Sequence, residues 1–354
     1  MKQMKSPLIV DREDTKWLLL DQVLSMTTSR RSRQEMAKQG LIPVQNTGSI
    51  QRILLITLFF SSEITYVIDE LTNRKELRAF AHIEEVPSAD DVYRFISRID
   101  ERQFIGLINA LLHTNCKPQR RTHRTIIVDG SALVLDLNIF KKKIRKADLV
   151  EKDYKWGYCN TKGYYLGFKL TLAIDYPSLI PLAFLVHPES PGDARLFAEI
   201  MDELKRRKII RTGDTVLFDR GYYSYNNYAL GITKYKIVPL IFPRKNFDPE
   251  KMMRKMNCPL SIFSSHQYRK KQQEYRGLVQ ELREKVKKWK EYPPIRSIIE
   301  DLFKVAKGAF SLHNLHRYSG ISVTKFVALN VLLLGAVVTA GVNQKIQLQR
   351  LAEA

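Results

Sequence analysis

The sequence predicts an α/β fold, and two observations support this prediction. Apolar residues repeat at helical spacing through the first hundred or so residues, whereas after residue 125 short strand-like runs alternate with helical patterns. Strands that alternate with helices form a sheet with helices on its faces. The chain has 354 residues, of which 44% are apolar, so it can build one large domain or two smaller ones around a real core.

The N-terminal part contains two long helix candidates. The segment SIQRILLITLFFSSEITYVIDEL (49–71) is mostly apolar, and the second candidate covers residues 86–112. Ser88 is a plausible N-cap of the second helix, because Asp91 stands three residues later, as in a capping box with Asp in the place of Glu. The apolar side chains that then follow at helical spacing are Val92, Phe95, Ile96 and Ile99.

After a basic link at 117–124, strand patterns dominate. The predicted elements are strands at 125–137, 164–175 and 180–187, a helix at 192–207, a strand at 214–221, a short helix near 224–232 and a strand at 236–244. A long, highly charged and solvated helix is expected at 265–292. Another helix is expected at 293–310, where Pro293 and Pro294 stand at positions that favour a helix start.

The composition indicates a polyanionic partner. The chain has 58 Lys and Arg against 37 Asp and Glu, a net charge of +21, which suits nucleic acid or an acidic membrane surface. Its three cysteines are far apart, so they support neither a zinc ribbon nor a disulfide framework, and they fit a reducing cytosol. The apolar run at 326–342 is shorter than the roughly 20 residues that span a bilayer. We expect it to form a helix buried against the sheet.

Two carboxylates are predicted to meet at one edge of the sheet. Asp129 lies within the first strand of this part and Asp219 ends the fourth. A right-handed crossover through the helix at 192–207 would make these strands parallel neighbours. Asp219, Arg220 and Gly221 also fit a surface turn, which is the alternative for that stretch. Two adjacent acids repel unless a cation lies between them, and a divalent metal with hard oxygen ligands is the natural one.

A third acid lies on the helix predicted at 293–310. At about 100° per residue, the apolar side chains Ile299, Leu302, Phe303, Ala306 and Phe310 form one stripe. An adjoining stripe carries Arg296, Glu300, Lys304 and Lys307. A surface helix with i,i+4 ion pairs explains this pattern too. Together with the two strand acids, however, the pattern favours Glu300 as a metal ligand. Three carboxylates can hold two Mg²⁺ ions roughly 4 Å apart for phosphoryl transfer, and the Lys and Arg side chains would bind the phosphate backbone.

These residues resemble the DD(E) transposases of prokaryotic insertion sequences. The similar segments are IIVDGS around the first Asp, LFDRGYYS around the second, and IRSIIEDLFKVAKGAFSLHNLHRYSG around the Glu. The resemblance is closest to the group with a Tyr-Arg-Glu-Lys signature. Arg296 stands four residues before Glu300 and Lys307 seven after it, as in that signature, whereas Pro293 replaces its Tyr and Tyr292 comes one place early.

The resemblance, which covers roughly residues 85–330, implies an RNase H-like fold, a mixed five-stranded sheet flanked by helices, with an N-terminal helical region. Residues 1–116 would bind DNA ends, and residues 117–340 would be catalytic, with a basic helical insertion at about 246–292. The implied catalytic residues and ligands of Mg²⁺ (or Mn²⁺) are Asp129, Asp219 and Glu300. The expected DNA contacts are Arg296, Lys307, Lys304 and Arg220.

The implied activity is cleavage at transposon ends followed by strand transfer into target DNA. Its partners would be the terminal inverted repeats and target DNA, bound by a homodimer in the cytoplasm, at the nucleoid, without a membrane. Two alternatives stay open: an RNase H-like nuclease without strand transfer, and a catalytically silent DNA-binding derivative.

Several other polar and aromatic residues have simpler interpretations. Asp175 is expected to be structural, Asp193 to start a helix and His187 to be a polar group at a strand end. Tyr222 and Tyr223 are expected to pack beside the sheet rather than stack on bases. His313 and His316 have no partner acid nearby and are not expected to bind a metal. The basic runs at 141–146 and 269–271 fit solvated charge and DNA contact equally well.

Overall fold

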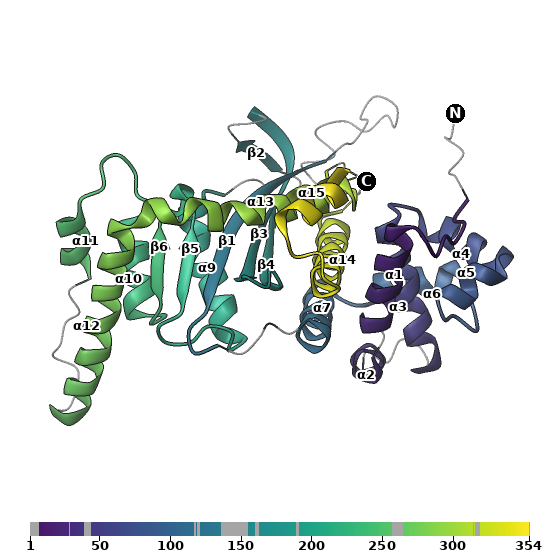
Figure 1. Ribbon diagram of the computed structural model, residues 1–354, viewed down its shortest axis with the longest axis horizontal. Coiled ribbons are helices and arrows are strands. Elements are labelled where there is room, and N and C mark those ends of the chain that lie inside the picture. The colour runs from purple at the N-terminus through teal and green to yellow at the C-terminus, as the bar shows by residue number, and fades with distance from the viewer. Residues whose placement is uncertain are drawn as a thin grey trace. The chain divides into compact units, whose positions relative to one another are not determined.

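The chain folds into two compact units in the computed structural model. The structure describes residues 7–27, 29–38, 44–116, 118, 121–135, 155–159, 163–188, 191–256, 265–313, 315 and 319–353. The helical unit takes in the described residues up to Cys116 and again those from Lys304 on, and the sheet unit takes in the described residues from Pro118 to Phe303. Figure 1 labels the elements of both units. The predicted division of roles between residues 1–116 and 117–340 stays a prediction.

The helical unit is built from nine helices among the described residues. They are α1 (Thr15–Thr27), α2 (Arg30–Ala37), α3 (Val44–Phe59), α4 (Ile64–Asn73), α5 (Lys75–Phe80), α6 (Ala89–Arg98), α7 (Glu101–Asn115), α14 (Gly320–Thr339) and α15 (Lys345–Glu353). The predicted capping box is confirmed, because Ser88 and Asp91 exchange both side-chain hydrogen bonds at the start of α6. The second long helix predicted is in fact two, since Asp100 caps a new helix, α7, with its side chain.

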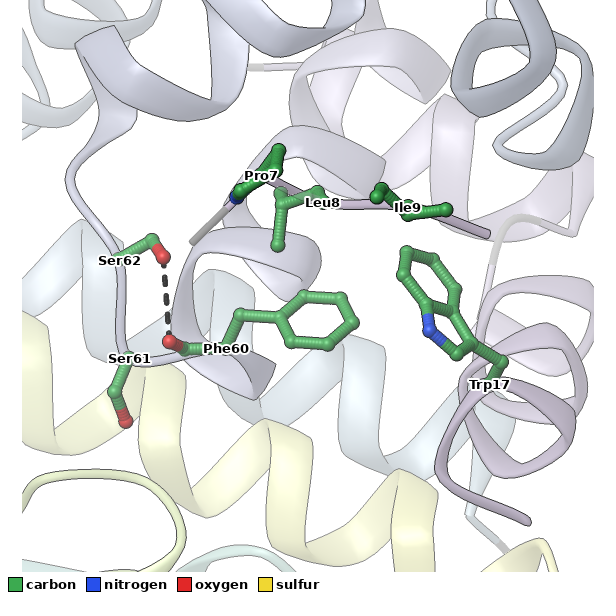
Figure 2. A pocket seen from close by; sticks show the side chains of 7 residues that line it. All are labelled: Pro7, Leu8, Ile9, Trp17, Phe60, Ser61 and Ser62. Atoms are coloured by element: carbon green, nitrogen blue, oxygen red, sulfur yellow. Dashed lines mark hydrogen bonds between the residues drawn. The ribbon is translucent and has the colours of Figure 1, made fainter. Parts of the chain in front are cut away.

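The first long helix predicted, 49–71, is also wrong as one element. The chain turns between α3 and α4, where Ser61 has a φ of 49° and the Ser62 amide donates to the Thr57 carbonyl. An open pocket lies at this turn, and Figure 2 shows the rings of Trp17 and Phe60 facing into it, with centroids 4.8 Å apart. The Trp17 side chain is almost fully buried, so its ring serves mainly as core.

Helix α14 is the apolar segment whose burial was predicted. It is long and apolar enough to cross a membrane, yet 83% of its apolar window is buried inside the structure. It packs on α7, α3 and α1, so the expectation that it packs against the sheet is wrong. Buried Lys325 reaches across this core and donates to the carbonyls of Ile96 and Ile99 at the end of α6. Burial lowers the pKa of the Lys325 ammonium.

Among the residues described, the sheet unit contains six strands. Two of them share one edge position, so the sheet is five strands wide. The six strands are β1 (Thr125–Val134), β2 (Lys155–Cys159), β3 (Gly163–Tyr176), β4 (Pro181–Pro188), β5 (Thr215–Phe218) and β6 (Val238–Ile241). β2 pairs with the first residues of β3 and β4 with the rest, so both lie on the same side of it. The order across the sheet then continues β3, β1, β5, β6. The prediction of a mixed five-stranded sheet is confirmed, and β2 is an extra short strand that the sequence analysis missed.

Parallel and antiparallel pairings meet at β1. This strand is antiparallel to β3 along all its residues and parallel to β5 only from Thr125 to Val128. β5 is in turn parallel to β6. β1 therefore continues beyond the end of β5, with β3 as its neighbour on one side.

Helices flank the sheet, as predicted. They are α9 (Asp193–Arg206), α10 (Tyr225–Thr233), α11 (Pro249–Lys255), α12 (Ser265–Lys287) and α13 (Pro293–Gly308), with short 3₁₀ turns at η1 (Arg220–Tyr222) and η3 (Trp289–Glu291). α9 contacts β3 and β4, while α12 contacts β6 and α10. α12 is thus not fully solvated, because Leu278, Leu282 and Val286 bury one of its faces.

Asp175 has the structural role that was predicted. Its side chain is completely buried near the end of β3, where it accepts a hydrogen bond from the Ser178 hydroxyl. Burial raises the pKa of this carboxyl, although Ser178 and Arg121 oppose the shift. The turn between β3 and β4 therefore has its own buried acid, which is separate from Asp129, Asp219 and Glu300.

Candidate active site

The first two acids lie side by side, Asp129 within β1 and Asp219 directly after the carboxyl end of β5. Val128 pairs with Phe218 in the parallel register, so Asp129 and Asp219 are the next residues on each strand. Asp129 continues in β1, whereas β5 ends and Asp219 leads into the turn η1. Side chains beyond paired ends of parallel strands project into the same region. The parallel neighbourhood expected from the sequence is therefore present.

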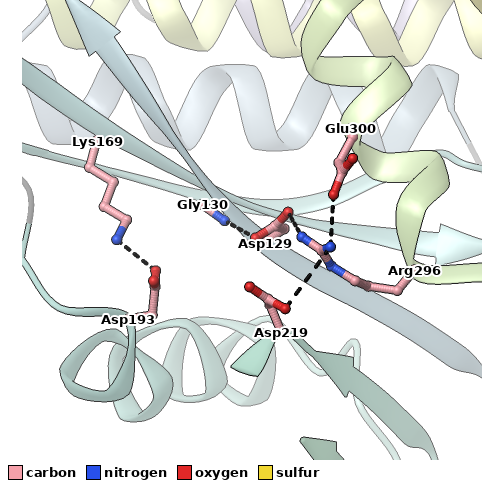
Figure 3. A network of polar contacts seen from close by, with 7 residues as sticks. All are labelled: Asp129, Gly130, Lys169, Asp193, Asp219, Arg296 and Glu300. Atoms are coloured by element: carbon pink, nitrogen blue, oxygen red, sulfur yellow. Dashed lines mark hydrogen bonds and ion pairs between the residues drawn. The ribbon is translucent and has the colours of Figure 1, made fainter. Parts of the chain in front are cut away.

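Helix α13 adds the third acid and a cation. Arg296 Nη2 lies 2.5 Å from Asp129 Oδ2, and Arg296 Nη1 lies 2.7 Å from Glu300 Oε1 and 4.0 Å from Asp219 Oδ1. Figure 3 shows the three carboxylates pointing toward this single guanidinium. The structure thus brings Asp129, Asp219 and Glu300 together, at one end of the sheet. Arg296, which the sequence predicts as a DNA contact, binds all three acids in this conformation.

Burial differs among the three acids and sets their electrostatics. The Asp129 side chain is 12% exposed, against 41% for Asp219 and 49% for Glu300. Burial raises the pKa of Asp129 to about 6, and the nearby Asp219 adds to the rise, although Arg296 and the Gly130 amide stabilise the charged form. Burial alone would lower the pKa of Arg296, but the three acids outweigh it, and its pKa is raised. The site is therefore shielded from solvent at Asp129 and accessible to solvent at Asp219 and Glu300.

The three side chains have the chemistry that a divalent cation prefers. Carboxylate oxygens are hard ligands suited to Mg²⁺ and Mn²⁺, and these three already converge on one positively charged group. Within the described ranges, no group of three or more His, Cys, Asp or Glu side chains is placed to hold an ion. In this conformation the guanidinium of Arg296 occupies the space among the three acids. By chemistry alone, three carboxylates suit a hard divalent cation.

The remaining predicted DNA contacts lie around this centre or along α13. Arg220 directly follows Asp219 in η1 and is exposed. Lys304 and Lys307 lie further along α13, in the portion that belongs to the helical unit. Lys304 is exposed and Lys307 is half-buried. Their contact with DNA stays a prediction.

The lesser candidates are resolved in part. Tyr222 is completely buried against Phe218, which confirms its packing role, and Tyr223 lies among other aromatic rings. His187 Nε2 lies 3.2 Å from Glu199 Oε2, and His313 contacts the carbonyl of Lys307. The remaining candidates are His316, the run 141–146 and the side chains of 269–271, which lie outside the described residues.

A buried ion pair beside the acids was missed by the sequence analysis. Lys169 of β3 contacts Asp193, the first residue of α9, at 2.6 Å. The signal in the sequence is a single lysine inside the apolar run LGFKLTLAID. Asp193 was predicted only as a helix-start residue, a role it also has.

We predict that the stability of Asp129→Asn, relative to that of wild type, increases as the pH rises. The folded protein holds the Asp129 proton more tightly than the unfolded chain does, since the pKa is about 6 instead of 3.8. Ionising this buried acid therefore destabilises the fold across that interval, and the full penalty is present above it. Asn cannot ionise, so the variant should gain up to roughly 3 kcal/mol on wild type between about pH 4 and pH 7. Urea unfolding in EDTA at both pH values measures the difference.

Asp69→Asn, at an exposed position of α4, is the control and should track wild type at both pH values. A stability difference for Asp129→Asn that stays constant from pH 4 to pH 7 would show that ionisation of this carboxyl does not oppose folding.

Comparison with known proteins agrees with this geometry. A family model described as the transposase DDE domain matches residues 120–335, more than half of the chain. The matched segment contains β1, β5 and α13, and hence all three converging acids. No curated protein sequence matches the chain. The resemblance read from the sequence is confirmed, and the chain belongs to the transposase DDE domain family.

Proposed function

We propose that this protein cuts DNA at the ends of a transposon and joins the freed ends to target DNA, using Mg²⁺ or Mn²⁺. The observation that carries the proposal is the gathering of Asp129, Asp219 and Glu300 from three distant segments around one cation. The net charge of +21 fits a polyanionic substrate. Membership in the transposase family supports the same reaction class.

Asp129, Asp219 and Glu300 are the residues that would hold the metal. When bound, divalent ions activate a water or a 3′-hydroxyl and stabilise the leaving oxygen of a phosphodiester. Asp129 supplies a nearly buried carboxylate on a strand, held by a hydrogen bond from the Gly130 amide. Asp219 and Glu300 present more exposed carboxylates from a turn and a helix, on the side that DNA can reach.

Arg296 has two uses in this proposal. Without metal and DNA it forms ion pairs with all three acids and offsets part of their negative charge. With them, it turns to a DNA phosphate, for which its planar, permanently charged fork is suited. Arg220, Lys304 and Lys307 would bind further phosphates. The helical region at 1–116 would bind the terminal inverted repeats, in a homodimer assembled on DNA at the nucleoid, in the cytoplasm.

The reaction is tested with DNA that carries the sequences flanking the protein's own gene. With Mn²⁺, the protein should cut at defined ends and produce joined molecules with a target plasmid. EDTA should abolish cutting and leave DNA binding in place. Cutting without joining, at no preferred end, would instead identify the nuclease alternative. Binding without any cutting would identify the silent derivative.

A further inference from the structure

A neutral ion pair lies directly against the backbone that carries the catalytic acids. Lys169 is only 7% exposed, and its ammonium contacts Asp193 at 2.6 Å and donates to the Pro191 carbonyl at 2.9 Å. Figure 3 shows the pair beside Gly130, the residue after Asp129. A buried charge pair of this kind is weak evidence for stability, because its desolvation can exceed the attraction. Its position suggests another role.

The pair fits against two glycines, and each glycine is close to one acid. A β-carbon at Gly130 would lie 2.7 Å from Lys169 Cε and 3.1 Å from Asp193 Oδ1. A β-carbon at Gly221 would lie 2.5 Å from Asp193 Oδ2. Gly130 follows Asp129, and Gly221 comes two residues after Asp219. Asp193 therefore lies against both acid-bearing segments, and a β-carbon at either glycine would force the Asp193 or Lys169 side chain to shift.

The buried hydroxyl of Tyr222 indicates the same proximity. Burial raises the pKa of Tyr222, and the charges of Asp193, Asp129 and Asp219 raise it further. Asp193 thus lies in the same electrostatic environment as the two acids, although it is bound to Lys169. Lys169 is in turn fixed on β3, opposite Ala132 of β1.

We infer that Lys169 and Asp193 are positioning residues, which hold β1 and the turn after β5 at the spacing that lets Asp129 and Asp219 bind one cation centre together. This inference rests on the proposed function. Lys169 fixes Asp193 to β3, and Asp193 holds Gly130 and Gly221 in place through direct contact. The pair acts by fixing the position of the Asp193 side chain, and not through its field, because its two charges largely cancel at the acids.

The test is a double-mutant cycle of Lys169→Met, Asp193→Asn and the combination, with Mn²⁺ as the probe. Mn²⁺ affinity is measured from the rise in melting temperature with Mn²⁺ concentration, and cleavage is measured on the flanking DNA. Each single variant should lose about tenfold or more in both, as supporting residues around a metal typically do. The double variant should lose no more than the worse single variant, since both act as one unit.

The exposed pair Lys234 and Asp202 provides the matched control. It joins the same two residue types at 2.8 Å, with Asp202 also on α9, and its side chains are 43% and 54% exposed. Lys234→Met and Asp202→Asn should behave as wild type in both measurements. DNA binding in EDTA should be unchanged for every variant, which separates a positioning effect from loss of the folded protein.

Gly221→Ala tests the contact from the other side. Its new β-carbon would push Asp193 away, so it should reproduce the loss of Mn²⁺ affinity. Gly192→Ala is its control, because within the described part of the chain, apart from its own neighbours in sequence, no atom lies within 4 Å of a β-carbon built there. If Lys169→Met and Asp193→Asn lower the melting temperature in EDTA but leave Mn²⁺ affinity intact, the inference is overturned in favour of a purely structural role.

Opposite effects of the two single variants would also overturn it. If the pair acted through charge, Lys169→Met would tighten Mn²⁺ binding and Asp193→Asn would weaken it. The proposed function fails separately, when wild type does not cut its flanking DNA. The inference alone fails when wild type cuts and binds Mn²⁺ while both single variants match it.

Discussion

Replacing Asp219 by alanine, or Glu300 by glutamine, is expected to lower the rate of DNA cleavage by roughly a thousandfold or more. Each substitution removes one of three carboxylates, and the remaining two acids cannot hold the divalent ions in the same geometry. Both side chains are about half exposed, so their removal should leave the fold intact. The measurement is the fraction of flanking DNA cut per minute with Mn²⁺.

Glu291→Gln is the matched control, since Glu291 is an exposed carboxylate in η3, close before α13 in the chain. It should cut at the wild-type rate. All four proteins should shift the same DNA in EDTA. Equal cutting by wild type, Asp219→Ala and Glu300→Gln would show that these acids are not the catalytic ones.

The second large effect is expected from Arg296→Met. Removing the guanidinium leaves nearly buried Asp129 without its ion pair, and such a loss typically destabilises a protein by roughly 3 kcal/mol. The loss should be greatest in EDTA at neutral pH. Added Mn²⁺ should restore much of it, because the ion takes over the role of the guanidinium among the acids. Urea unfolding with EDTA or Mn²⁺ measures both effects.

A lower pH should also reduce the destabilisation caused by Arg296→Met. At about pH 5 most of the Asp129 carboxyl is protonated, given its pKa of about 6, so Arg296 has less charge to neutralise. Arg283→Met, at an exposed position of α12, removes the same side chain without touching an acid of the site, and its stability should not depend on Mn²⁺ beyond the effect seen in wild type. An equal stabilisation of wild type and Arg296→Met by Mn²⁺ would contradict the idea that the arginine and the metal compete.

Much of the sheet was predictable because its strands are short apolar runs separated by turn residues. The parallel neighbourhood of the strands that carry Asp129 and Asp219 was predicted from a right-handed crossover, whereas the pairing of Val128 with Phe218 is a finding of the structure. The short strand β2 was not predictable, since its five residues, KWGYC, carry no continuous apolar pattern and pair only with the start of β3.

The site was predictable in its residues but not in its contacts. Asp129, Asp219 and Glu300 stand at recognisable places in their motifs. The hydrogen bond between Arg296 and Asp129 joins residues 167 positions apart, and no local pattern encodes it. The burial of α14 followed from its composition, whereas the elements that bury it did not, because an apolar surface is equally suited to a sheet or to helices.

The end of the parallel pairing between β1 and β5 gives the two carboxylate oxygens of Asp129 different contacts. Parallel pairing stops at Val128 while β1 runs on beside β3, so the acid stands at the opening between β1 and β5. There Oδ1 accepts the Gly130 amide at 2.8 Å and is tethered to the backbone, whereas Oδ2 faces α13. A side chain anchored by one oxygen loses little rotational freedom when a cation arrives at the other. The continuation of β1 past the end of β5 thus fixes one oxygen of Asp129 on the backbone and leaves the other directed toward α13.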